Sequence, residues 1–135
     1  MFLTVDPEDK APIYRQVADG IRSLIAPREL AEGAQLPPVR QLAADLGVNL
    51  NTIAVAYREL QDEGLITVRH GSGSVVSSAT TRPVERSDED LRRPLRSALT
   101  GLVLAGIAPA QIVTIVLSEL KSVVPTNKFR MWGRK

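Results

Sequence analysis

The sequence predicts a mostly α-helical fold with one small β-hairpin, divided into two parts by a polar linker. Three observations support this prediction. Three helical patterns precede residue 65, two short β-branched runs surround a glycine-rich loop over 65–76, and two more apolar helical patterns follow residue 87. The chain has 135 residues, of which 44% are hydrophobic, so it can form one small packed domain with an appendage.

The first helical pattern begins at Pro12, because proline is favoured in the first turn of a helix. Its apolar residues recur at the spacing of a single helix face and are Ile13, Val17, Ile21, Leu24 and Ile25. Pro27 and the turn at Glu32 and Gly33 end the pattern. We therefore expect an amphipathic helix with one buried face.

Two shorter helices are expected next, with a tight turn between them. The first covers about Val39 to Leu46 and ends at Gly47, the residue type most common just after a helix. Asn49 is placed to cap the second helix, because its side chain can accept a hydrogen bond from a free amide of the first turn. The inward face of this second helix is formed by Ile53, Tyr57 and Leu60, and the helix ends near Glu63 and Gly64.

A β-hairpin follows these helices. The run 65–69 is rich in β-branched residues, 70–73 is a glycine-bearing loop, and 74–76 is a second short run. Helix, helix, helix and hairpin within about 65 residues is the order of a winged helix-turn-helix. We therefore expect residues 1–76 to form a domain of this class.

The second part of the chain is predicted to be a two-helix tail. Residues 77–86 are small, polar and interrupted by proline, as is typical of a linker. Ser87 and Asp90 form a capping box for the next helix, which either bends at Pro94 or begins there. A break at 106–109 separates it from a last helix, which ends at Pro125. The two-helix tail therefore covers 87–125, and a loose basic segment follows at 126–135.

The apolar faces of the tail predict a homodimer. Two helices of this size cannot cover both faces alone, and the same pair from a second subunit is the simplest partner. The expected dimerisation residues are Leu91, Leu95, Leu99, Leu102, Ile112, Val116 and Leu120. In the alternative, the tail folds back on its own winged helix.

A membrane-spanning alternative rests on the uncharged run 97–118, which is long enough to cross a bilayer. Glycine, proline and polar residues interrupt this run, and helix-ending signals fall in its middle, so we expect no membrane partner. The chain has no cysteine, and its first residues lack a basic stretch followed by an apolar run. We therefore expect a cytoplasmic protein.

Charge is distributed in a way that favours nucleic acid at one surface. Residues 1–76 contain seven Lys or Arg against ten Asp or Glu, and residues 77–135 contain ten against five. Two windows nevertheless lack acidic residues, between Asp45 and Glu59 and between Glu63 and Glu85. These windows fall on the third helix and the hairpin, where a DNA surface would lie.

Candidate DNA contacts lie on the outward side of the helix-turn-helix, where Asn51, Thr52, Val55 and Arg58 point away from the inward face of the third helix. Asn51 can pair with adenine through two hydrogen bonds, and Thr52 suits either a base edge or a phosphate. Arg58 lies further along the same helix and can contact a phosphate, whereas Arg40 lies near the start of the preceding helix, placed for a phosphate or guanine. Without the surrounding pattern, the first turn of the third helix would be interpreted as an ordinary solvated cap.

Four segments resemble the GntR family of regulators, in order and spacing, over residues 11–76. They are Pro12-Ile13-Tyr14-Arg15-Gln16-Val17, Leu36-Pro37-x-x-Arg40-x-Leu42-Ala43, Gly47-Val48-Asn49-x-Asn51-Thr52 and Tyr57-Arg58-Glu59-Leu60-x-x-Glu63-Gly64-Leu65-Ile66. The asparagines and the short helical tail resemble the YtrA-like branch. The resemblance implies a homodimeric repressor that binds a palindromic DNA operator and is released by a small-molecule effector. By motif position it assigns DNA contacts to Arg40, Asn49, Asn51, Thr52, Arg69, His70 and Gly71.

This chain departs from the family pattern at two places. Pro38 stands where the family commonly has a serine, so it cannot cap the second helix through a hydroxyl group. Leu50 and Ala54 stand where some members have proline or arginine. Fewer charged contacts with bases follow from these differences.

Other functions are less consistent with the sequence. No set of nucleophile, base and orienting residue is present, so we expect no enzyme and no catalytic residue. With a single histidine and no cysteine, we expect no metal site and no cofactor. The alternative function is a winged helix that docks another protein without binding an operator.

Overall fold

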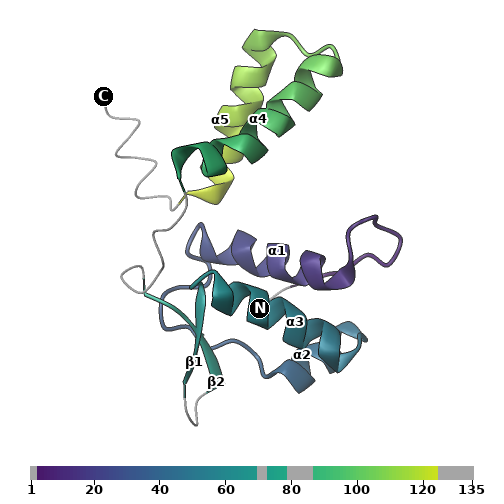
Figure 1. Cartoon of the computed structure of the whole chain (residues 1–135), viewed down its shortest axis with the longest axis vertical. Coiled ribbons are helices and arrows are strands. Elements are labelled where there is room, and N and C mark those ends of the chain that lie inside the picture. The colour runs from purple at the N-terminus through teal and green to yellow at the C-terminus, as the bar shows by residue number, and fades with distance from the viewer. Residues whose placement is uncertain (1–2, 70–72, 79–86, 125–135) are drawn as a thin grey trace. The chain divides into compact units, whose positions relative to one another are not determined.

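The structure is a computed structural model that describes residues 3–69, 73–78 and 87–124. It divides into two compact units, Met1–Pro83 and Val84–Lys135. The first unit contains the elements α1 (Ile13–Ile25), α2 (Val39–Leu46), α3 (Leu50–Asp62), β1 (Ile66–Arg69) and β2 (Gly73–Val76) (Figure 1). This order confirms the predicted winged helix-turn-helix.

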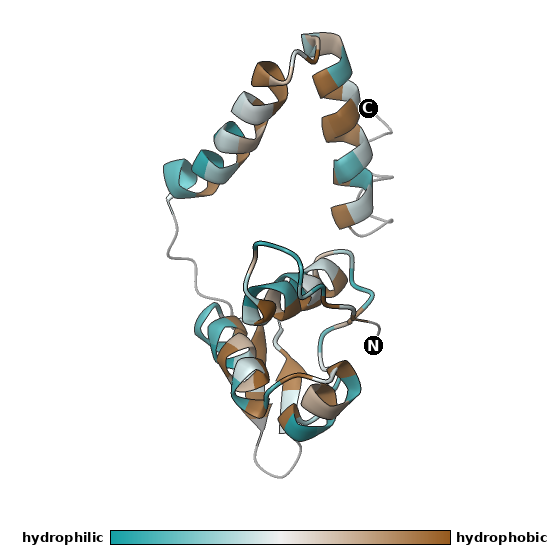
Figure 2. Ribbon diagram, turned by 90° about the vertical axis from the view of Figure 1, so that its right-hand side faces the viewer, coloured by the Kyte–Doolittle hydropathy of each residue, from teal (hydrophilic) through white to brown (hydrophobic). Residues whose placement is uncertain are grey.

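The core of the first unit lies between α1 and α3, which pack against each other while α2 packs on α3. Val17 and Ile21 on α1 and Ile53 and Leu60 on α3 are completely buried. Figure 2 shows the hydrophobic turns of these helices facing the centre of the unit. The predicted inward faces are therefore confirmed, except that Ile13 and Leu24 are only half-buried.

The turn between α2 and α3 follows the expected chemistry. Gly47 adopts a left-handed conformation with φ 68°, which residues that carry a β-carbon rarely adopt. The backbone N–H of Val48 then donates to the carbonyl of Ala43 at 3.0 Å, closing the C-terminal end of α2. Ala43 is buried in the core that α2 shares with α1 and α3, so a larger side chain would disturb this packing.

β1 and β2 form an antiparallel hairpin in which Ile66 pairs with Val76 and Arg69 with Gly73. The segment before α2 lies on the free edge of β2: Val76 N–H donates to the carbonyl of Ala34, and Leu36 N–H to that of Ser74, both at 2.9 Å. The hairpin is thereby tied to the segment that leads into α2.

The fold continues one residue past β2. Ser77, the first residue of the expected linker, is buried, and its hydroxyl lies 2.6 Å from that of Thr67. Its backbone N–H donates to the carbonyl of Leu65 at 2.9 Å. The rest of the expected linker from residue 79 onward, and the basic segment 126–135, lie outside the described residues.

The second unit is a pair of helices, α4 (Asp88–Leu104) and α5 (Pro109–Val123), which contact each other. The side chain of Ser87 accepts a hydrogen bond from the N–H of Asp90 at 3.1 Å, which confirms the predicted cap. α4 begins before Pro94 and continues through it, so the helix does not start at the proline. Among the described residues, no helix is both long and apolar enough to cross a membrane.

Candidate nucleic-acid interface

Three exposed side chains lie along one line of α3 on the side opposite the core, ahead of the exposed Asp62 in its last turn. Ile53, Ala56, Tyr57 and Leu60 are buried, and the helical repeat of 100° per residue places the other side of the helix in solvent. This outward row, as we call it, consists of Asn51, Val55 and Arg58, all of them exposed. An amide, an apolar group and a guanidinium group are therefore presented along one line of α3.

The start of α3 is held by its cap. The side-chain oxygen of Asn49 accepts a hydrogen bond from the backbone N–H of Asn51 at 2.8 Å. Asn49 thus has a structural role, whereas the side chain of Asn51 is exposed and that of Thr52 is half-buried. The cap fixes the backbone at the end of the helix where base contacts are expected.

Arg40 lies in the first turn of α2, where Pro38 provides no side-chain cap. A helix N-terminus with free amides favours anions, and a nearby guanidinium group strengthens that preference. Arg40 and Arg58 are exposed, and neither forms a hydrogen bond or an ion pair within the part of the chain that the structure describes. Both are therefore available to phosphate.

Tyr57 ties α3 to the segment preceding α2. Its hydroxyl donates a hydrogen bond to the backbone carbonyl of Pro37 at 2.6 Å. Burial raises the pKa of Tyr57 to about 12, because the ionised phenolate would lose its hydration. This bond sets the position of α2, and with it Arg40, relative to the outward row.

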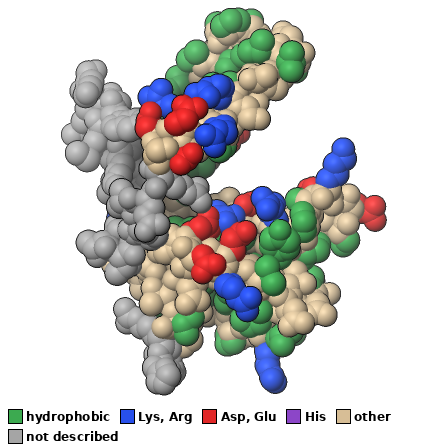
Figure 3. Space-filling view, viewed as in Figure 1, with side chains coloured by type: hydrophobic (Ala, Val, Ile, Leu, Met, Phe, Trp, Pro, Cys, Tyr) green, Lys and Arg blue, Asp and Glu red, His purple; other side chains and the backbone are tan. Residues whose placement is uncertain are grey.

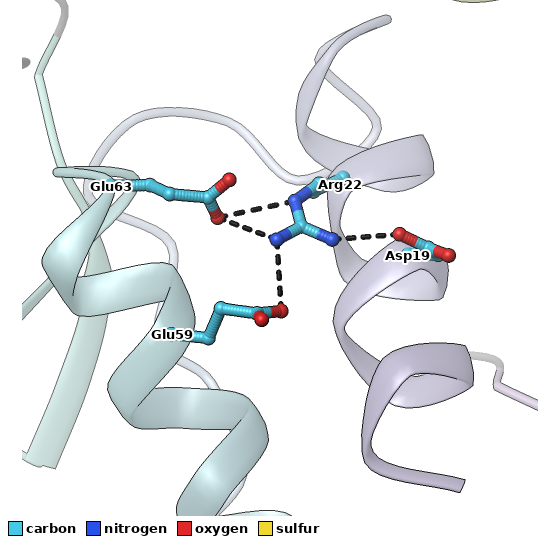
Figure 4. A network of polar contacts seen from close by, with 4 residues as sticks. All are labelled: Asp19, Arg22, Glu59 and Glu63. Carbon is cyan, nitrogen blue, oxygen red and sulfur yellow. Dashed lines mark hydrogen bonds and ion pairs between the residues drawn. The ribbon is translucent and has the colours of Figure 1, made fainter. Parts of the chain in front are cut away.

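Acidic groups gather around Arg22, between α1 and the C-terminal end of α3 (Figure 4). Arg22 on α1 pairs with Glu63 at 2.6 Å, Glu59 at 3.0 Å and Asp19 at 2.7 Å. Partial burial lowers the pKa of Arg22, but hydrogen bonds to Glu63 and Glu59 outweigh this effect and leave that pKa raised. The network joins α1 to the end of α3 and binds two of the helix's carboxylates away from the row.

Of the three predicted DNA contacts in the hairpin, only Arg69 lies within the described residues. The backbone of Arg69 lies in β1, and its predicted DNA contact stays a prediction. His70 and Gly71, the other two predicted contacts of the loop, lie outside the described residues.

The second unit carries a large apolar surface. Of the seven expected dimerisation residues, Ile112 is buried, Leu99, Leu102 and Leu120 are half-buried, and Leu91, Leu95 and Val116 are exposed. Exposed apolar side chains outside this expected set are Val103, Leu104, Val113, Ile115, Leu117 and Val123. Figure 3 shows apolar side chains spread over the surface of this unit.

Sequence reasoning missed two features of the first unit. One is the network in which Arg22 pairs with Glu59 and Glu63, which follow it by 37 and 41 positions in the sequence. Local sequence patterns do not indicate such distant pairs. The apolar member of the outward row, Val55, was recognised as outward but not as a contact residue. Its signal was available: an exposed apolar residue between two polar ones on the same helix face.

Comparison with known proteins gives a consistent result. Residues 13–76 match the family model described as bacterial regulatory proteins of the gntR family. The HTH-type transcriptional repressor YtrA of Bacillus subtilis is 32% identical over 107 residues, which cover 78% of this chain and 82% of that protein.

Two solved structures resemble this chain in fold, and each matches it over most of its length. YtrA from Sulfolobus acidocaldarius, a GntR-family transcription factor, is 43% identical with a TM-score of 0.59, covering 73% of this chain and 97% of its own. A structure described as a transcriptional antiterminator from Listeria monocytogenes EGD-e is 25% identical with a TM-score of 0.79, covering 92% of this chain and 93% of its own.

Proposed function

The chain belongs to the GntR family and is a DNA-binding transcription regulator, and we propose that it is a repressor that binds a palindromic operator as a homodimer. One observation carries the proposal. The outward row of α3 presents Asn51 and Arg58, Arg40 is exposed in the first turn of α2, and no acidic residue occurs between Asp45 and Glu59. Such a surface suits the major groove, with the amide at base edges and the guanidinium groups at phosphates.

The homodimer is supported by the exposed apolar side chains of α4 and α5. Soluble proteins rarely leave contiguous apolar surface uncovered, and a second copy of the same helix pair would bury it in a symmetric bundle. Two copies of α3 would then contact half-sites about one helical turn of DNA apart. Repression is proposed from the likeness to the repressor YtrA.

Two further parts of the proposal rest on family membership. We infer that the protein acts in the cytoplasm, where it reaches DNA, and that a small-molecule effector releases it from the operator. An effector that binds the free protein in preference to the complex would raise the melting temperature of the protein and lower its affinity for the operator. A screen of small metabolites with these two readouts would identify such a compound.

Selection of bound sequences from random duplex DNA tests the proposal. The full chain should enrich an inverted repeat, and binding to it should weaken steeply between about 50 and 200 mM salt. A protein-docking winged helix would enrich no sequence and would show no such salt dependence. Failure to enrich any sequence would therefore contradict operator binding, and enrichment of a single half-site would contradict binding as a dimer.

A further inference from the structure

We propose that Val55 recognises a thymine in the operator through contact with its 5-methyl group. This inference rests on the proposed function, because it places the outward row in the major groove. The inference adds an apolar residue that determines specificity to the polar contacts proposed for Asn51, Arg58 and Arg40. The carrying observation is an apolar side chain in the middle of a row that is otherwise polar and basic.

Val55 lies at the centre of the proposed contact line rather than at its edge. Asn51 lies one turn before it and Arg58 one turn after it on the same face, so Val55 is about 6 Å along the helix axis from Asn51. If Asn51 reaches a base edge and Arg58 a phosphate, Val55 lies over the bases between them. Its side chain is 42% exposed.

Chemistry selects thymine as the target. A valine side chain has no hydrogen-bond donor or acceptor, and thymine is the one base that presents a methyl group in the major groove. Valine is also stiff in a helix, where a single rotamer dominates, so its methyl groups are held in place before DNA binds. Little side-chain entropy is therefore lost when the contact forms.

Exposure alone does not distinguish Val55, since isolated exposed apolar residues are common. Leu50 is equally exposed at 42%, but it is rotated about 140° around α3 from Val55. Leu50 therefore lies off the outward row: whatever contact it makes elsewhere in the operator, its replacement should leave the methyl effect at the thymine contacted by Val55, so it serves as a matched control. Position on the row, and not exposure, assigns the role to Val55.

The experiment uses the full chain and the duplex obtained by selection. Each thymine of a half-site is replaced in turn by deoxyuridine, which lacks only the methyl group. We expect one replacement to weaken binding of the unmodified protein about threefold to tenfold. Val55→Ala should bind the thymine and deoxyuridine duplexes equally, while Leu50→Ala should retain the methyl effect at that thymine. Alanine favours helices, so α3 should persist in both variants, and thermal unfolding checks this.

The outcomes separate the two proposals. If the selected duplex is bound but no deoxyuridine replacement weakens binding, or if Val55→Ala shows the same methyl effect as the unmodified protein, the role of Val55 is wrong and operator binding stands. If selection enriches no sequence, operator binding itself is contradicted, and the thymine contact is contradicted with it.

Discussion

The hydroxyl of Tyr57 in the middle of α3 donates a 2.6 Å hydrogen bond to the backbone carbonyl of Pro37, just before α2 begins. The bond links two segments twenty residues apart and satisfies the hydroxyl of a side chain that is buried in the core. It also fixes the start of α2, which carries Arg40. The geometry of the candidate DNA surface thus depends on a contact inside the domain.

Tyr57→Phe should change how stability depends on alkaline pH. The pKa of Tyr57 is raised from 10.0 to about 12 in the folded protein, so the unfolded chain releases the proton first. The contribution is fully present below pH 10 and is lost as pH rises through about 12. The unmodified protein should lose about 2 kcal/mol more unfolding free energy over this range than the variant. Urea denaturation at several pH values measures this, and parallel profiles would contradict it.

Arg22→Met should destabilise the first unit by about 1–2 kcal/mol, because Glu59 and Glu63 lose the cation that lies between them. Asp19→Asn is the matched control: its carboxylate is 62% exposed, so its loss should cost less than about 0.5 kcal/mol. Urea denaturation at low salt gives both values. Equal stability of Arg22→Met and the unmodified protein would show that the network contributes nothing.

Local sequence patterns predicted most of the fold, because its turns, caps and buried helix faces are determined by residues that are close in the sequence. The left-handed turn at Gly47 and the caps at Asn49 and Ser87 follow from side-chain chemistry within four residues. The buried faces of α1 and α3 follow from helical periodicity, and the hairpin from β-branched runs around glycine. Each of these signals is short-range.

Contacts between distant segments could not be predicted in the same way. The edge pairing of Ala34 and Leu36 with β2 involves only a few residues next to two prolines, too short for a strand pattern. Whether α4 bends or begins at Pro94 could not be decided from the sequence, because proline interrupts the interior of a helix but is tolerated in its first turn. Of the candidate site, the outward row was predicted from periodicity, whereas the Arg22 network and the Tyr57 bond required the three-dimensional structure.

Arg40→Ala should weaken binding to all duplexes by a similar factor, because a phosphate contact carries no sequence information. The slope of log affinity against log salt should fall by about 1 per bound subunit. Titrations at several salt concentrations measure the slope, with Arg28→Ala, in the loop after α1, as the control. A loss of affinity confined to one sequence would instead indicate a base contact for Arg40.

Asn51→Ala should relax preference at one or two base positions and cost about 1–3 kcal/mol on the preferred duplex. Its folded stability should be retained, because the cap uses the backbone N–H of Asn51 and the side chain of Asn49. Repeating the selection with the variant measures the change. An unaltered sequence preference would refute a base-reading role for Asn51.

Val116→Glu should dissociate the proposed dimer, because it places an unpaired carboxylate within the exposed apolar surface of α5. Gln111→Glu adds the same charge on the polar side of the helix and should leave the dimer intact. Sedimentation measures the oligomeric state, and affinity for the inverted repeat should fall with it. A Val116→Glu variant that sediments as the unmodified protein would exclude this surface from the interface.

The central claim is that the outward row of α3 is the surface that meets DNA. Titration of the isotopically labelled full chain with the selected duplex, followed by backbone NMR shifts, tests it most directly. We expect the largest changes at Arg40, Asn51, Val55 and Arg58, with little change at Asp19 and Arg22. Changes concentrated around Arg22, or confined to α4 and α5, would contradict it.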